Sequence, residues 1–151
     1  MQGGEALMES IFPFVDETTM AEITNTTTEM PREYAWDFTA NNFKLVNGKV
    51  QIVEGLEAIK IKVYKALMTQ RYRYPVYSWD YGHELEDLIG QGYSKELTEA
   101  EAKRLVEEAL KDLFDKGWIT EIKDFETEFA EDELNISFTI VTPHGEEQIN
   151  V

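Results

Sequence analysis

The sequence predicts an α+β domain over residues 34–151, built from a mixed or antiparallel sheet of about five to six strands and two main helices packed on it. Asn47-Gly48 stands between two apolar runs and is a strong hairpin signal, because a type I′ turn needs positive φ at both positions. Apolar residues recur at helical spacing in residues 55–68 and 98–116, and they alternate in residues 134–142. Runs of strands separated by two helices indicate this class.

Composition narrows the possible functions. A chain of 151 residues with 42% hydrophobic residues is long enough for one domain with a core, and it has no cysteine for disulfides or thiolate metal sites. The formal net charge of −16 would repel a phosphate backbone, so we expect no nucleic-acid partner. No run of 18 apolar residues or basic leader occurs, so we expect a soluble protein with no membrane partner.

Residues 1–33 read as an extended N-terminal arm rather than an independent fold, since they combine Gly3-Gly4, a threonine cluster and Pro31. The apolar segment 11–15 could anchor this arm. Three antiparallel strands should follow before the first helix. Their patterns are the alternation of Tyr34, Trp36 and Phe38 and the two runs beside the Asn47-Gly48 turn.

A helix from Gly55 to Met68 is indicated by a single apolar stripe at positions 56, 59, 63 and 67. The segment that follows, Tyr72 to Tyr81, is half aromatic, and Tyr74 precedes a proline, which disfavours a helix. We expect an extended, packed platform here, with tyrosines in the core and arginines outward. A short helix should then run from His83 to Ile89.

The second half of the chain has the clearest helix. Thr98 and Glu101 form a capping box before a long apolar stripe, and Gly117 can end the helix in a left-handed conformation. Two strands should follow, 119–129 and 134–142, with a bulge near Thr120 because Ile119 and Ile122 would otherwise face opposite sides. After a turn at 143–145, the tail 146–151 can pair as a short edge strand, and we expect the fold to tolerate its removal.

One basic island interrupts the acidic sequence, because no acidic residue occurs between Glu57 and Asp80. Arginines placed outward can bind a protein carboxylate with fork geometry. The tail offers backbone groups that a partner strand could complete. The predicted protein-interaction residues are therefore those of the island and of the tail: Lys60, Lys62, Lys65, Arg71, Arg73, Glu146, Gln148 and Asn150.

Catalytic or metal chemistry has one constellation to test, formed by Asp80, His83, Glu84 and Asp87. His83 and Asp87 would share one helix face at i, i+4 spacing, which can present two ligands. With 30 carboxylates in the chain, chance proximity to a histidine is expected, and Asp80 can simply cap the helix. We therefore assign no catalytic residue, no metal ligand and no cofactor.

A family resemblance rests on the same central region. The run G-L-E-A, then K-A-L-M-T, then R-Y-R-Y-P-V-Y-S-W-D-Y-G-H-E-L resembles the small baseplate protein of PBSX-like contractile phage tails. That group is similar to the baseplate wedge or sheath-initiator family of larger contractile phages, some members of which are labelled lysozyme-like. The family pattern is matched by Leu67 and Thr69, by Arg71 and Arg73, and by Tyr81, Gly82 and Leu85. A Glu-Pro-Arg motif of the larger proteins is replaced here by residues 115–119.

The resemblance implies a non-enzymatic structural component of a tail baseplate in the virion, assembled in the bacterial host cytoplasm. It implies tail sheath protein and other wedge, tube or hub proteins as partners, multiple copies, six in an assembled baseplate, and a role in starting the first sheath ring. Two alternatives stay open. One is a carboxylate-dependent glycan hydrolase, which needs two carboxylates flanking a sugar, and the other is an acidic protein–protein adaptor.

Overall fold

The structure, a computed structural model, describes residues 29–130 and 133–151. The proposed arm over residues 1–33, with its apolar segment 11–15, therefore lies almost wholly outside the described residues. Its last two residues, Arg32 and Glu33, already belong to a strand. The described elements in chain order are β1 (Arg32–Tyr34), β2 (Trp36–Asp37), β3 (Asn42–Phe43), β4 (Leu45–Val46), β5 (Lys49–Val50), β6 (Ile52–Glu54), α3 (Leu56–Leu67), η1 (Leu85–Leu88), α4 (Lys95–Ala109), α5 (Lys111–Asp115), β7 (Glu121–Ala130), β8 (Glu133–Thr142) and β9 (Gly145–Asn150).

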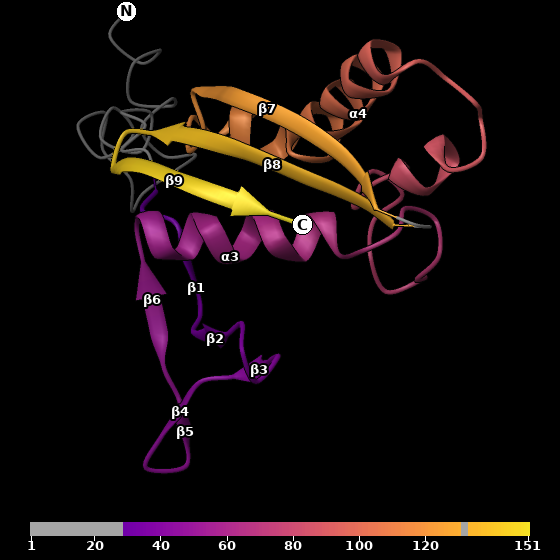
Figure 1. The fold of residues 1–151 in the computed structure, drawn as a ribbon. Coiled ribbons are helices and arrows are strands. Elements are labelled where there is room, and N and C mark those ends of the chain that lie inside the picture. Colours follow the sequence, from indigo (N-terminus) through magenta and orange to yellow (C-terminus); the bar gives the residue numbers. More distant parts are fainter. Residues whose placement is uncertain (1–28, 131–132) are drawn as a thin grey trace, which may run out of the picture.

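The α+β class is confirmed, and the described strands divide between two regions instead of joining in one sheet. β7, β8 and β9 form a three-stranded antiparallel sheet, with α3 packed along β9 and α4 along β7 (Figure 1). The six short strands pair as β1–β6, β2–β3 and β4–β5. They form a projection, residues 32–54, that extends away from the N-terminal end of α3 (Figure 1).

The core lies between the three-stranded sheet and the two helices. Ile136, Phe138 and Ile140 are at most 3% exposed, which confirms the face predicted from their alternation. Ile59 and Val63 of α3 and Val106 of α4 are fully buried against them. Burial of such side chains contributes about 1.5–3 kcal/mol each and fixes both helices on this face.

α4 begins one turn before the predicted cap. Ser94 is the N-cap residue, and its hydroxyl accepts a hydrogen bond from the Leu97 N–H at 3.3 Å. The prediction of Thr98 as the cap was wrong, because Thr98 is buried inside the helix and Glu101 pairs with Arg104. The helical region also breaks at Leu110 into α4 and α5.

The register of β7 shifts between Lys123 and Glu126, where Asp124 has a φ of 52°, which is further along the strand than the bulge expected near Thr120. Thr120 lies just before β7, and its N–H donates to the carbonyl of Val141, the residue that pairs with Glu121. The extra residue turns Phe125 towards the core, where its ring stacks on Phe138 at 5.8 Å. Aromatic packing therefore sets the position of the bulge.

Two turns follow the sequence closely. Asn47 and Gly48 have φ of 52° and 74°, as a type I′ turn requires, and they form the tip of the β4–β5 hairpin. Gly117, with a φ of 70°, ends α5 as predicted, because only a left-handed residue lets the chain turn towards β7. Within the described ranges, no helix has the length and apolar character to cross a membrane.

Candidate protein-interaction surfaces

The tail forms β9, the regular outer edge of the three-stranded sheet, which confirms the predicted edge strand. Ile136 and Val151 exchange both backbone hydrogen bonds, at 2.7 and 2.9 Å. Because inward and outward backbone groups alternate along an antiparallel strand, Glu147 and Ile149 face β8, whereas the N–H and C=O groups of Glu146, Gln148 and Asn150 face outward. The three tail residues predicted from the sequence thus share the free edge.

One of these outward groups is already occupied. The Tyr64 hydroxyl of α3 donates to the Asn150 carbonyl at 2.9 Å. No hydrogen bond within the described ranges reaches the outward backbone groups of Glu146 or Gln148. The opposite edge, on β7, is interrupted by the bulge at Asp124, which disfavours strand addition there.

The tail also belongs to the core, which corrects the expectation that the fold tolerates its loss. Ile149 is fully buried under α3, and Glu147 forms an ion pair with Lys60. Removing residues 146–151 would take away an apolar side chain and a whole hydrogen-bonded strand. The edge can therefore be tested only by changes that leave the inward-facing residues in place.

The lysines of the basic island line α3, and the structure pairs each of them within the chain. Lys62 and Lys65 contact the two oxygens of Glu33 at 3.2 and 3.3 Å. Burial would raise the pKa of Glu33, but the hydrogen bond from the Tyr34 N–H and the two ammonium groups outweigh it and lower that pKa. These ion pairs hold the projection against α3.

Arg71 lies differently from the prediction. Its side chain is only 7% exposed, and its guanidinium contacts Glu108 at 2.8 Å and Glu84 at 3.8 Å. The hydrogen bond from Arg71 lowers the pKa of Glu108. Arg71 therefore clamps the loop after α3 onto α4, while Arg73 is exposed and donates to Gln70.

The expected packed aromatic platform was wrong. Residues 72–81, here called the aromatic loop, form successive turns because Tyr72 has a φ of 64° and cannot continue a strand. Its rings contact one another, as in Tyr72 and Trp79 at 5.7 Å, but most of them face solvent. Exposure reaches 60% for Tyr72, 74% for Trp79 and 84% for Val76. Only Tyr81 is packed against the core, and burial raises its pKa to about 12.

The tested metal or catalytic constellation does not assemble. The helix after the loop is the short 3₁₀ segment Leu85–Leu88, so His83 and Asp87 do not share a helix face. His83 is buried, and its Nδ1 accepts from the Leu85 N–H at 3.1 Å, while Glu84 is engaged by Arg71. In the part of the chain that the structure describes, no group of three acidic, histidine or cysteine residues could hold a metal ion.

The projection has an apolar face whose exposure the sequence pattern did not predict. Tyr34 pairs with Ile52, Trp36 with Phe43 and Leu45 with Val50, so these six side chains project from one face of the ladders. Five of them are exposed by 41–58% and Trp36 is half-buried. The opposite face carries Ala35, which is buried, and Glu33, which contacts α3. Alternation alone could reveal this face but not its exposure.

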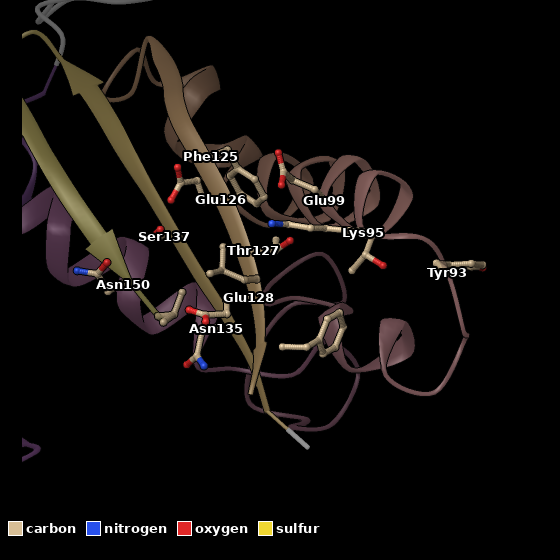
Figure 2. Close-up of a pocket in the computed structure, with 14 residues that line it drawn as sticks. Tyr93, Lys95, Glu99, Phe125, Glu126, Thr127, Glu128, Asn135, Ser137 and Asn150 are labelled. Carbon is tan, nitrogen blue, oxygen red and sulfur yellow. The ribbon is translucent and has the colours of Figure 1, made fainter. Parts of the chain in front are cut away.

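A cleft of 1150 Å³ opens between the N-terminal end of α4 and the sheet (Figure 2). Glu126, Glu128, Ser137 and Asn150 line it from the strands, and Lys95 and Glu99 line it from the helix (Figure 2). A glycan hydrolase needs a carboxyl group with a raised pKa. Every described carboxyl with a shifted pKa, on Glu33, Asp37 and Glu108, has it lowered, and none of the three lines this cleft.

Taken together, an open strand edge and exposed apolar surfaces are the features of a small domain that binds other proteins in an assembly. The family model for the contractile injection system sheath initiator matches residues 32–145. The phage-like element PBSX protein XkdS of Bacillus subtilis is 37% identical over 128 residues, which cover 82% of this chain and 83% of that protein. The chain belongs to the sheath-initiator family, and its place among phage tail structural proteins is confirmed.

Proposed function

We propose that this protein sits in the tail baseplate, links wedge and tube-proximal proteins to the first sheath ring, and starts sheath assembly by strand addition at β9. The family match supports the general role. The observation that carries the specific role is the outward edge formed by Glu146, Gln148 and Asn150, along which the backbone groups of Glu146 and Gln148 are open and the Asn150 carbonyl accepts from Tyr64. A partner strand would complete these backbone groups.

Strand addition suits a protein that must accept one end of a repeating assembly. Main-chain hydrogen bonds provide the affinity, and alternate side chains of the partner provide selectivity. β9 keeps an unbroken register with β8 over its six residues, so it offers a longer template than the two- and three-residue strands of the projection. We infer that the sheath protein supplies the incoming strand and that several copies, six around the tube, present this edge together.

The basic island has a smaller part in this proposal. Lys65 and Arg73 remain exposed beside their internal partners, so both could contact an acidic neighbour in the baseplate. Lys60, Lys62 and Arg71 would act indirectly, by holding β9, the projection and the aromatic loop in place. Exposed ion pairs contribute about 0–1 kcal/mol each, so docking should depend mainly on the strand edge.

The test is Gln148→Pro. Proline removes the outward N–H of residue 148 and leaves the inward bonds of Glu147 and Ile149 in place, so the domain should fold. We expect soluble protein with native circular dichroism that joins baseplates but does not nucleate sheath, seen as naked tubes in electron micrographs.

Gln148→Ser is the matched control, because it changes the same side chain and keeps the N–H. It should give normally sheathed tails. Sheathed tails from Gln148→Pro at the wild-type frequency would contradict strand addition at this edge.

A further inference from the structure

The apolar face of the projection has no partner within the described part of the chain. Five large apolar side chains, each at least 41% exposed, lie on one side of a thin set of two-stranded ladders. Exposed apolar surfaces of this kind, bordered by polar residues, mark contacts with other proteins. The polar border here includes the ion pair between Arg32 and Glu54 at 2.8 Å.

A second apolar surface lies at the other end of α3. The projection leads into the N-terminal end of this helix at Gly55, and the aromatic loop follows its C-terminal end (Figure 1). α3 has 12 residues and is about 18 Å long, and the two segments that carry these surfaces join its opposite ends, although Glu33 of β1 reaches the last turn of the helix at Lys65. The aromatic loop presents Trp79, Val76 and Tyr72, of which tryptophan and tyrosine are favoured anchors at interfaces.

Charge distinguishes these two surfaces from the rest of the molecule. With a net charge of −16, two copies repel each other over most of their surfaces. The projection carries three basic and three acidic residues: Arg32, Lys44, Lys49, Glu33, Asp37 and Glu54. Residues 58–79, which include most of the aromatic loop, contain no acidic residue, and Arg71 pairs with the nearby carboxylates of Glu84 and Glu108. The two exposed apolar surfaces therefore lie in the segments that another copy can approach with little repulsion.

We propose that the copies of this protein contact one another head to tail, with the apolar face of the projection packed on the aromatic loop of the next copy. Such a heterologous contact uses two different surfaces of the same chain, so it repeats and can close into a ring. The contact needs no other tail protein and leaves the β9 edge free. Its failure would therefore not affect the proposal of strand addition.

Cysteine pairing tests the contact directly, because the natural chain has no cysteine. Leu45→Cys places one thiol on the apolar face, and Val76→Cys places the other on the aromatic loop. We expect a mixture of the two variants, under mild oxidation, to give a several-fold excess of mixed disulfide dimer over either variant alone. The double variant should give a ladder of higher oligomers.

A collision control separates this contact from random encounters. Glu107→Cys puts a thiol on the exposed side of α4, and its mixture with Leu45→Cys should give only the background yield. Efficient homodimers of Leu45→Cys alone would show a symmetric contact between projections and overturn the proposal. A mixed yield of Leu45→Cys and Val76→Cys no higher than this control would also overturn it.

Discussion

Strand β8 and the projection both alternate apolar and polar side chains, yet their apolar faces end in different surroundings. In β8 the alternate residues Ile136, Phe138 and Ile140 are covered by two helices. In the projection, Leu45 and Ile52 remain 58% and 54% exposed. Alternation of apolar and polar residues therefore predicts which face of a strand is apolar, but it does not predict what packs on that face. In a protein that assembles with others, the apolar face can pack on another chain.

Alanine substitution should change the free energy of unfolding much more on the buried face of β8 than on the exposed face of the projection. Phe138→Ala removes a ring that is 1% exposed and stacked on Phe125, so it should lower the free energy of unfolding by about 3–5 kcal/mol. Leu45→Ala should change it by less than about 0.5 kcal/mol, because no core depends on that side chain in the free protein. Urea unfolding followed by circular dichroism measures both. An equal cost at the two positions would show that the apolar face of the projection is already covered in the monomer.

Weakening the contact between the projection and α3 should have a smaller and more local effect on stability. Glu33 is 12% exposed and contacts both Lys62 and Lys65, so Glu33→Gln should loosen the projection by about 1–2 kcal/mol. Hydrogen exchange should accelerate at the amides of β1 and β6 and stay slow in β8. Glu54→Gln is the matched control, since its ion pair with Arg32 is more than half exposed and contributes little.

The contact between Glu33 and the lysines of α3 should weaken as the pH falls. The pKa of Glu33 is lower in the folded protein than in the unfolded chain. Its contribution is therefore complete above the unfolded value of about 4.3 and is lost as the pH falls through the folded value. Acid should release the projection in the wild type and lower the protection factors of its β1 amides, whereas Glu33→Gln should show low protection factors at every pH. Wild-type protection factors that stay as high in acid as at neutral pH would contradict this attachment.

Local patterns predicted much of the fold, because they depend on contacts within a few residues. The Asn47-Gly48 turn, the end of α5 at Gly117 and the buried face of β8 were all confirmed. Two of the wrong predictions depended on long-range contacts. The bulge follows Phe125 packing on Phe138, and the position of Arg71 follows its contact with Glu108, which is 37 residues away. Neither contact is encoded in a short window of sequence.

The candidate interaction sites were also predictable only in part. The residues of the β9 edge could be named from the sequence, because a turn followed by a short terminal run indicates an edge strand, but Ile149 was missed as a core residue. The aromatic loop was assigned to the core on composition, and the positive φ of Tyr72 is not visible in the sequence. Large apolar side chains that stay exposed depart from the tendency of apolar residues to be internal, and this departure marks the candidate interfaces.

The smallest effect on stability concerns His83, whose backbone exchanges hydrogen bonds with Thr69 and Arg71 at the base of the aromatic loop. Burial lowers the pKa of His83, and its neutral Nδ1 accepts the Leu85 N–H at 3.1 Å. Because the folded value lies below the unfolded value of about 6.5, this contribution to stability is complete above pH 6.5 and is lost as the pH falls towards the folded pKa. The melting temperature should therefore fall slightly between pH 7 and pH 5. In His83→Asn, whose side-chain oxygen can accept the same hydrogen bond and does not titrate, the slope over this range should be flatter. If the two slopes are equal, a different group titrates in this range, and the aromatic loop is held to the domain by the Arg71 clamp without a contribution from the protonation state of His83.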